Sequence, residues 1–339
     1  MLNLKFIRDN REFIIERLKI KNFDAREIID QIITLYNKRG NIQQEIDQKQ
    51  NELKLLSKNI GKLFKEGKAK EANEAKQKTP ELKESIKEAS QKMAAVEMEL
   101  DEFIIQVPNI PHDSVPAGTS ENDNILIREG GDIPELKNTP LAHWDLGKKY
   151  DILNFDLGNK ITGTGFPLFK AKGAALQRAL INYFLDEAGK EGFTEYLPPL
   201  MVNESSAFAT GQLPDKEGQM YQLKDENFYL IPTAEVPVTN IFRDTILKEE
   251  DLPVKLTAYT PCFRREAGSY GKDVRGLNRV HQFDKVEIVI VEHPEKSYET
   301  LDYMVKHTER LICSLGLPYR ILRLCGGDLS FTSALTYDF

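Results

Sequence analysis

Two long apolar seams in the first third of the sequence constrain the fold most. From Ile32 onward, residues spaced alternately three and four apart fall on one side of a helix, and most of them are apolar. The first seam is Ile32, Leu35, Arg39, Ile42, Ile46, Lys49, Leu53, Leu56, Ile60 and Leu63, and the second is Leu82, Ile86, Ala89, Met93, Val96, Leu100, Phe103 and Val107. Two such helices bury their seams economically against each other. The spacing therefore predicts an antiparallel helical hairpin.

The segment between the two seams contains helix-ending and helix-starting signals. It reads FKEGKAKEANEAKQKTP. Gly67 is expected to end the first helix, and Thr79 and Pro80 are typical of the cap and first position of the second. Helices of about 30 residues or more, rising 1.5 Å per residue, give an arm that reaches about 50 Å from its base. We expect this arm to end near Ile110 and to stand in solvent.

The far end of the predicted arm is basic although the whole chain is acidic. Residues 54 to 92 contain eleven Lys and six Glu, a formal charge of +5, whereas the 339-residue chain carries −7. Such a run often only solubilises an exposed coiled coil. At the end of a projecting arm it also suits a polyanion, because each neutralised phosphate releases counterions. The hairpin alone fits a dimerisation stalk or a scaffold protein equally well.

Length and composition exclude several classes of protein. A length of 339 residues favours two domains, and 29% charged residues make the chain too polar for a membrane protein. No apolar run approaches the roughly 20 residues that span a bilayer, and MLNLKFIRDN has no extended apolar segment of a signal peptide. Cys262, Cys313 and Cys325 lack the spacing of zinc ligands or of a disulfide framework. We expect a cytoplasmic protein with no membrane segment and no metal site of its own.

The remaining two thirds of the sequence predict an α+β fold. After a linker rich in Pro, Gly, Asn and Asp, residues 173 to 192 have helical period, and the β-rich runs FTEYLPPLMV, NFYLIPTAEVPV, KLTAYTPCFRRE and VHQFDKVEIVIVE follow. Late strands with few crossover helices between them favour an antiparallel sheet flanked by helices. We therefore expect a helical arm over residues 1–110 and a second domain over residues 111–339.

Ordinary nucleotide-binding loops are missing from the sequence. GSYGK at 268 to 272 fails the P-loop spacing, and GTGF at 163 to 166 lacks the third glycine of a dinucleotide turn. Bound phosphates would have to be held by side chains. Residues 262 to 283, CFRREAGSYGKDVRGLNRVHQF, supply five cations against two acidic residues: Arg264, Arg265, Lys272, Arg275 and Arg279 against Glu266 and Asp273.

This basic stretch is expected to form two strands joined by a glycine-punctuated loop. Strand alternation would place Arg264 and Glu266 on one face, and Phe283 and Glu287, four residues apart, also share a face. Arginine clamps phosphate oxygens, a carboxylate accepts a hydrogen from an exocyclic amine, and an aromatic ring stacks on a base. The pattern fits a purine nucleotide site. A hairpin whose Arg and Glu side chains only pair with one another on its exposed face fits equally well.

The same stretch resembles motif 2 of class II aminoacyl-tRNA synthetases. The motif reads F-R-x-E at residues 263 to 266 and R-x-x-x-F at Arg279 to Phe283. The string FRREAGSYGKDVRGLNRVHQFDKVE, the segment TAEV at 233 to 236 and the helical arm resemble seryl-tRNA synthetases in particular. Residues 173 to 199, a long helix leading to Pro198 and Pro199, resemble motif 1. The resemblance covers nearly the whole chain and implies a class II catalytic domain that forms a homodimer through motif 1.

The resemblance also implies the function and the site residues. It implies a serine–tRNA ligase that uses ATP and Mg²⁺ and acts on L-serine and tRNA(Ser). The implied ATP-binding residues are Arg264, Arg265, Glu266, Val280 and Phe283, of which Arg264 and Glu266 are catalytic. The implied serine-binding residues are Thr233, Ala234, Glu235, Arg264 and Glu287. The tRNA-binding residues are expected to be Lys54, Lys58, Lys62, Lys83 and Lys87 in the arm and Lys272 and Arg275 in the motif 2 loop.

The end of the sequence departs from the family pattern. Motif 3, a glycine-rich strand and helix with a second ATP-binding arginine, has no counterpart after Glu287, and the sequence ends at FTSALTYDF. We expect a catalytic domain that is incomplete at its C-terminus, shorter than the family's by several tens of residues. The alternatives are a noncatalytic homologue that binds tRNA, a coiled-coil scaffold, and a class II synthetase for another amino acid.

Overall fold

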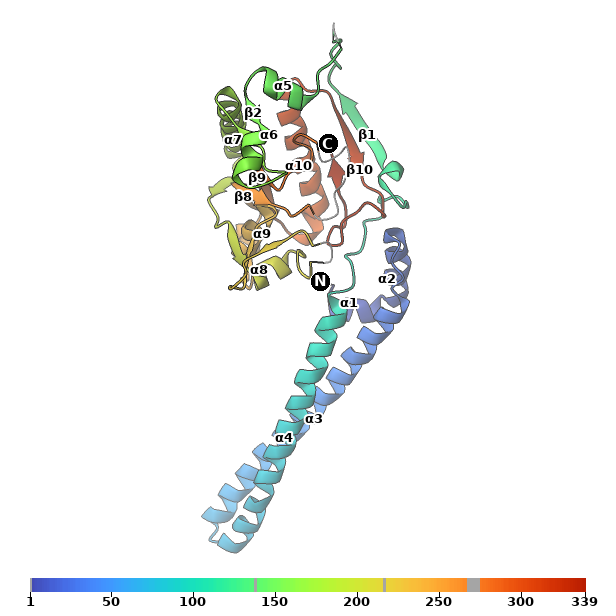
Figure 1. The fold of residues 1–339 in the computed structure, drawn as a ribbon. Coiled ribbons are helices and arrows are strands. Elements are labelled where there is room, and N and C mark those ends of the chain that lie inside the picture. Colours follow the sequence, from blue (N-terminus) through green and yellow to red (C-terminus); the bar gives the residue numbers. More distant parts are fainter. Residues whose placement is uncertain (1, 137–138, 216–217, 267–274) are drawn as a thin grey trace. The chain divides into compact units, whose positions relative to one another are not determined.

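The computed structural model describes residues 2–136, 139–215, 218–266 and 275–339 (Figure 1). The chain forms two compact units. The arm unit comprises Met1–Arg128 and Ile321–Phe339, and the sheet unit comprises Glu129–Arg320. Each unit is described by itself below.

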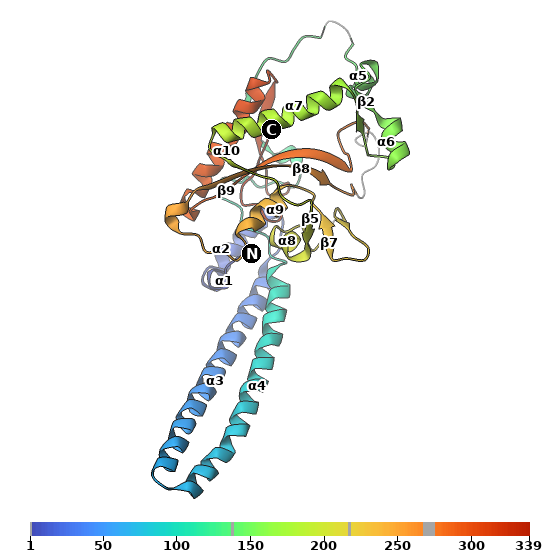
Figure 2. The same cartoon turned by 90° about the vertical axis from the view of Figure 1, so that its left-hand side faces the viewer.

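The arm unit is dominated by two long antiparallel helices, α3 (Arg26–Lys65) and α4 (Ala69–Ile104). They lie side by side and are joined by a short turn (Figures 1 and 2). Polar residues on the predicted seam make contacts between the helices: Arg39 Nε donates to Glu97 Oε1 at 2.9 Å, and Lys49 Nζ donates to Ser85 Oγ at 2.6 Å. The predicted helical hairpin is confirmed.

The turn of the hairpin confirms one sequence expectation and corrects another. Gly67 ends α3 with φ +75°, and the Lys68 and Gly67 amides return to the carbonyls of Leu63 and Phe64. However, α4 begins at Ala69 and runs through Pro80, so Thr79 is not its cap. The intervening AKEANEAKQKT is rich in strong helix formers, and their summed preference outweighs the single backbone hydrogen bond that an exposed proline removes.

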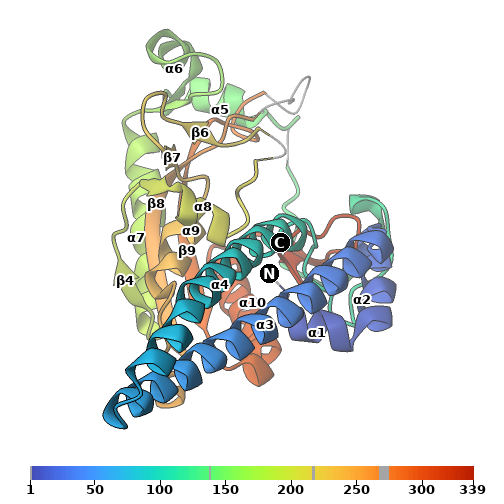
Figure 3. The ribbon, with the colours of Figure 1, turned by 90° about the horizontal axis from the view of Figure 1, so that it is seen from below.

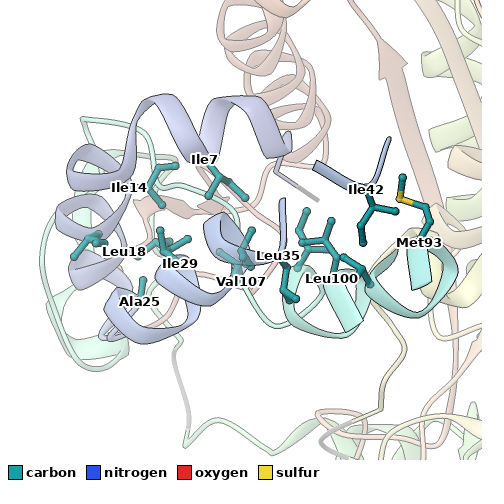
Figure 4. Packing of buried hydrophobic residues seen from close by; sticks show 14 of the residues in the cluster. Ile7, Ile14, Leu18, Ala25, Ile29, Leu35, Ile42, Met93, Leu100 and Val107 are labelled. Atoms are coloured by element: carbon teal, nitrogen blue, oxygen red, sulfur yellow. The ribbon is translucent and has the colours of Figure 1, made fainter. Parts of the chain in front are cut away.

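A large apolar core lies at the base of the arm (Figure 4). Helices α1 (Leu4–Asp9) and α2 (Arg11–Leu18) and the 3₁₀ turn Lys19–Lys21 pack beside α3 there (Figure 3). The core contains Ile7, Ile14, Leu18, Ile29, Ile32, Val96 and Leu100, among other residues. Burial of the α3 seam is complete near this base, whereas Leu53, Leu56, Ile60 and Leu63 are only half-buried. The arm is therefore anchored at its base.

Residues of the same unit take part in a small sheet, and the unit includes the last residues of the chain. Strands β1 (Ile125–Gly130), β10 (Tyr319–Arg323) and β11 (Tyr337–Asp338) lie in that order, and the 3₁₀ turn Glu121–Asp123 precedes β1. Lys21 Nζ donates to the carbonyls of Ser330, Phe331 and Ser333 at 2.7 to 3.2 Å. The two ends of the chain thereby meet within one unit.

The sheet unit is built around the long hairpin β8 (Val254–Phe263) and β9 (Gln282–Val291). These strands are antiparallel, with Cys262 opposite Phe283 and Ala258 opposite Glu287. Strand β4 (Thr194–Tyr196) pairs with β8 in parallel, so this three-stranded sheet is mixed rather than purely antiparallel. The parallel pairing is possible because long chain segments separate β4 from β8. The α+β class is confirmed.

Helices cover both faces of the β8–β9 hairpin. Helix α7 (Lys172–Lys190) contacts both strands, as Figure 2 shows, and α10 (Ser297–Ser314) reaches the same face where Lys255 Nζ donates to Tyr303 Oη at 3.2 Å. The opposite face packs on α9 (Glu235–Thr239) through Val238, Leu256 and Ala258. The segment TAEV was expected in a β-rich run. Its first two residues, Thr233 and Ala234, precede α9, and the other two begin this helix.

The smaller elements of the sheet unit flank the hairpin. Strands β5 (Met201–Asn203), β7 (Phe228–Leu230) and β6 (Tyr221–Gln222) form an antiparallel sheet beside α8 (Glu204–Ala209). Strands β2 (Leu153–Asn154) and β3 (Leu168–Phe169) pair next to α5 (His143–Lys149) and α6 (Phe155–Ile161). The 3₁₀ turns are Asn240–Phe242, Glu249–Asp251 and Pro294–Lys296.

Candidate active site

One face of the β8–β9 hairpin gathers the predicted site residues. Cross-strand partners in an antiparallel pair point to the same side of the sheet. The register therefore places Thr260 and Cys262 of β8 on one face with Phe283, Lys285 and Glu287 of β9. We call this the α9 face, because α9 packs on its far end. The prediction that Phe283 and Glu287 share a face is confirmed.

Arg264 continues this face just beyond the end of β8. Its backbone amide donates to the carbonyl of His281 at 2.9 Å, which extends the ladder by one residue. Its Nε donates to the carbonyl of Pro232 at 3.3 Å, and its guanidinium carbon lies 5.1 Å from the centroid of the Phe283 ring. The cation is thus fixed over an aromatic face by a hydrogen bond and by the ring quadrupole.

Glu266 reaches the site in a different way from the one expected. The strand ends at Phe263, and Glu266 has φ +47°, so strand alternation does not extend from Arg264 to Glu266. The Glu266 carboxylate instead lies 3.7 Å from Arg279 Nη1, and its side chain is 16% exposed against 56% for Arg279. The turn in the backbone decides where this carboxylate points.

The other expected nucleotide residues lie near this pair. Val280 is buried and immediately precedes His281 in the segment that leads into β9. The backbone amide of Arg265 donates to the carbonyl of Gln219 at 2.9 Å, and its charge acts on the hydroxyl of Tyr221, whose pKa is nevertheless raised because desolvation dominates. Arg265 therefore lies next to the segment that leads into β6.

A buried hydroxyl and two charges form the polar centre of the α9 face. Thr233 Oγ1 donates to Glu287 Oε2 at 2.9 Å, and Lys285 Nζ lies 3.0 Å from Thr233 Oγ1 and 2.9 Å from Glu287 Oε2. The side chains of Lys285 and Glu287 are 35% and 18% exposed. Lys285 was not predicted from the sequence. Its position midway between Phe283 and Glu287, on the same face, was the signal that could have found it.

Glu235 is the second carboxylate of this centre. Its backbone amide donates to Thr233 Oγ1 at 3.2 Å. The residue is exposed by surface area, yet protein atoms surround its carboxylate, and this desolvation raises its pKa, with the charge of Glu287 adding to the effect and Lys285 opposing it. A carboxylate in this setting favours a cationic partner. Ala234 is fully buried in the core with Val238, so its side chain faces away from solvent.

Two comparisons with protein-family models cover both units. Residues 1–111 match the seryl-tRNA synthetase N-terminal domain, and residues 220–339 match the tRNA synthetase class II core domain for G, H, P, S and T. The serine–tRNA ligase of Salinibacter ruber is 44% identical over 338 residues, and that of Clostridium tetani is 45% identical over 341 residues. Each alignment covers 100% of this chain and 79% of the relative.

The chain belongs to the seryl-tRNA synthetase family. Solved structures agree with this assignment. Seryl-tRNA synthetase from Pyrococcus horikoshii, complexed with ATP, has a TM-score of 0.90 and 32% sequence identity. The alignment covers 100% of this chain and 80% of that protein's chain. The cytoplasmic serine–tRNA ligase of Naegleria fowleri, in complex with AMP, has a TM-score of 0.86 and 26% identity, with 100% and 81% coverage.

The predicted tRNA contacts of the family fall in different parts of the chain. Lys54, Lys58 and Lys62 are exposed at four-residue spacing along one side of α3, and Lys83 and Lys87 are exposed on α4. A shallow hollow of about 540 Å³ lies on α3 beside Lys54 and Lys58. Lys272 lies outside the residues that the structure describes. Arg275 is described and stacks on Trp144, with 4.7 Å between its guanidinium carbon and the ring centroid.

Metal coordination by the protein alone is not evident in the described part of the chain. There, no group of three or more His, Cys, Asp and Glu side chains could hold a metal ion. Mg²⁺ bound with a nucleotide uses phosphate oxygens and only one or two carboxylates. Because Glu266 is paired with Arg279, an Mg²⁺ ion that arrives with ATP would depend mainly on the phosphate oxygens. Within the same residues, no helix is long and apolar enough to cross a membrane.

Proposed function

We propose that this chain activates L-serine with ATP to seryl-adenylate and transfers the seryl group to the 3′ end of tRNA(Ser). The observation that carries the proposal is the α9 face, where the Arg264–Phe283 contact and the Thr233–Lys285–Glu287 cluster share one side of a rigid hairpin. Such a face can hold a nucleotide phosphate, a base and a small amino acid side by side. Family membership supports the same reaction.

ATP would lie along the Arg264 end of this face. Arg264 would clamp the α-phosphate, the Phe283 ring would stack under adenine beside Val280, and Glu266 would accept a hydrogen from the exocyclic amine. Arg265 and Arg279 add positive charge at the same end. Since Arg264 is already hydrogen-bonded and stacked, little reorganisation is needed when charge develops on the phosphate.

Serine would lie at the polar centre. Its ammonium would pair with Glu235, whose pKa is raised by desolvation and by the charge of Glu287. Its hydroxyl would reach Thr233 and Glu287, and the buried Ala234 would contribute only main-chain atoms. Alanine has no hydroxyl and would make none of these hydrogen bonds, which is the main source of discrimination against it.

Adenylation then requires positioning more than proton transfer. A serine carboxylate oxygen attacks the α-phosphorus in line, the bond between the α-phosphorus and the bridging oxygen breaks, and pyrophosphate leaves. Mg²⁺ that arrives with ATP would be held mainly by the phosphate oxygens and would add charge neutralisation there. The terminal ribose 3′-hydroxyl of tRNA next attacks the carbonyl of the adenylate, and AMP leaves. Arg264 stays paired with the α-phosphate through both steps.

The remaining parts of the proposal concern the whole chain. Residues 1–110 would bind tRNA through the exposed lysines of the arm, and residues 111–339 would carry catalysis. Two copies would associate through the motif 1 region, which includes α7. The protein would act in the cytoplasm, where its tRNA substrate is found.

Serine-dependent exchange between ATP and labelled pyrophosphate tests the proposal directly on this 339-residue chain. We expect exchange with serine, far less with threonine or alanine, and loss of exchange in Arg264→Ala. A folded chain that binds tRNA but shows no exchange would contradict the proposal and leave a noncatalytic tRNA-binding homologue or an incomplete catalytic domain.

A further inference from the structure

Three consecutive residues at the end of the motif 2 loop lie against the start of helix α5. We call Arg275–Val280 the return limb, because it leads the chain back into β9. The guanidinium of Arg275 stacks on the Trp144 ring, with 4.7 Å to the centroid. The amide of Leu277 donates to Nε2 of His143 at 2.7 Å. His143 and Trp144 are the first two residues of α5 and lie edge to face with ring centroids 4.9 Å apart.

Gly276, between these two contacts, is fitted closely to the same pair. Its φ of +84° is rarely adopted by residues with a side chain. A Cβ on this glycine would lie 2.0 Å from Nε2 of His143 and 2.9 Å from the Trp144 ring. The backbone can therefore approach α5 only because residue 276 is glycine. Two contacts, with a glycine fitted closely between them, indicate a built interaction rather than a chance approach.

The return limb ends at residues that the proposed ATP site uses. Arg279 pairs with Glu266 at 3.7 Å, Val280 is buried, and the His281 carbonyl accepts the backbone amide of Arg264. We propose that His143 and Trp144 are positioning residues that fix the return limb, and through it Glu266, Arg279 and Val280, for ATP. This inference rests on the function proposed above.

The proposal assigns Arg275 a role that does not require tRNA. The sequence placed Arg275 among the tRNA contacts, but its stacking on Trp144 holds the limb before any tRNA binds. Adenylate formation involves no tRNA, so a pure tRNA contact would not affect it. The two roles can therefore be separated by measuring the first half-reaction alone.

Fluorescence gives a test that is independent of activity, because Trp144 is the only tryptophan of the chain. We expect acrylamide to quench this residue more strongly in Arg275→Met and in His143→Leu than in the wild-type chain. His143→Gln, which keeps a hydrogen-bond acceptor, should restore most of the protection. Equal quenching in the wild type, Arg275→Met and His143→Leu would overturn the proposed contact, whatever reaction the protein catalyses.

Kinetics of pyrophosphate exchange without tRNA give the functional test. Loss of one neutral hydrogen bond in His143→Leu is expected to raise KM for ATP roughly 5-fold, with KM for serine little changed. Trp144→Leu should give a similar rise through loss of the cation–π contact, and Trp144→Phe a smaller one. Unchanged KM for ATP in both His143→Leu and Trp144→Leu would overturn the positioning role.

A pair of glycines supplies a matched control. Gly192 has φ +81° and has nothing within 4 Å of where a Cβ would be, so Gly192→Ala carries the backbone strain of Gly276→Ala without its collision. Only Gly276→Ala should raise KM for ATP and expose Trp144. Equal effects of the two substitutions would show that strain alone matters and overturn the proposal. A wild-type chain without exchange would count against the proposed function, while the quenching comparison would still decide the contact.

Discussion

The guanidinium carbon of Arg264 lies 5.1 Å from the centroid of the Phe283 ring, at the loop end of the β8–β9 hairpin. The register that places Cys262 opposite Phe283 sets this contact, because it leaves Arg264 one residue beyond the last strand pair on the same face. The cation proposed for the α-phosphate and the ring proposed for adenine are thus adjacent side chains.

Arg264→Lys keeps the charge but loses the planar fork and the extended stacking surface. We expect kcat for pyrophosphate exchange to fall by about 10²- to 10³-fold. Removing one hydrogen-bond donor to a developing negative charge has an effect of this size in other enzymes. Arg310→Lys, whose arginine pairs with Glu191 away from this face, serves as the control. Comparable rates for Arg264→Lys and the wild type would contradict the assigned role.

Thr233→Val replaces a side chain that is 4% exposed with one of the same shape but no hydroxyl. Glu287 then loses one of its hydrogen-bond donors, which we expect to cost about 1 kcal/mol of stability and to raise KM for serine more than KM for ATP. Urea unfolding and exchange kinetics measure the two effects. Thr233→Ser should behave like the wild type, and a selective rise of KM for ATP would count against a serine pocket here.

Glu235→Gln tests the pH dependence of stability. Desolvation and the neighbouring charge of Glu287 raise the folded-state pKa of Glu235 above its ordinary value of 4.5. The ionised carboxylate therefore lowers stability at pH 7, and this penalty fades as the pH falls below the folded-state pKa toward 4.5, where the unfolded state also becomes protonated.

Glu235→Gln should accordingly raise Tm at pH 7 and change it little at pH 4, while weakening serine binding. A scan of Tm against pH for both proteins measures this difference. A substitution that lowers Tm equally at both pH values would show that Glu235 is structurally paired instead.

Lys54, Lys58 and Lys62 share one side of α3 and are exposed. If each meets one phosphate, replacing all three with Gln should reduce the slope of log K for tRNA binding against log salt by about 2 to 3. Filter binding between low and moderate salt measures the slope. The exposed lysines Lys248, Lys296 and Lys306 of the sheet unit provide a triple variant of equal charge, and equal slopes for the two triples would exclude a specific arm contact.

Pro80→Ala tests the continuous α4. Proline in a helix interior costs about 3 kcal/mol relative to alanine, and Pro80 is exposed, so its replacement should stabilise the helix locally. Hydrogen exchange of the amides around residue 80 should slow in the variant. Unchanged exchange would indicate that the helix begins at Pro80, as the sequence suggested.

Local signals in the sequence determined the arm and pointed to most residues of the candidate site. Seam spacing specified both helices, Gly67 specified the end of α3, and the motif 2 string pointed to Arg264, Phe283 and Glu287. Thr79 and Pro80 misled because a local cap signal competes with the summed helix preference of the residues before it.

Only the tertiary structure decided how distant segments complete the candidate site. The β4–β8 pairing is parallel, Glu266 turns back toward Arg279 because its backbone leaves the strand, and Lys285 joins Thr233 from a different segment. His143 and Trp144 carry no motif, and their contacts with Arg275 and Leu277 depend on how α5 packs. Periodicity reports which side of its own element a residue occupies, whereas contacts between distant elements are set by packing of the whole unit, which no local pattern encodes.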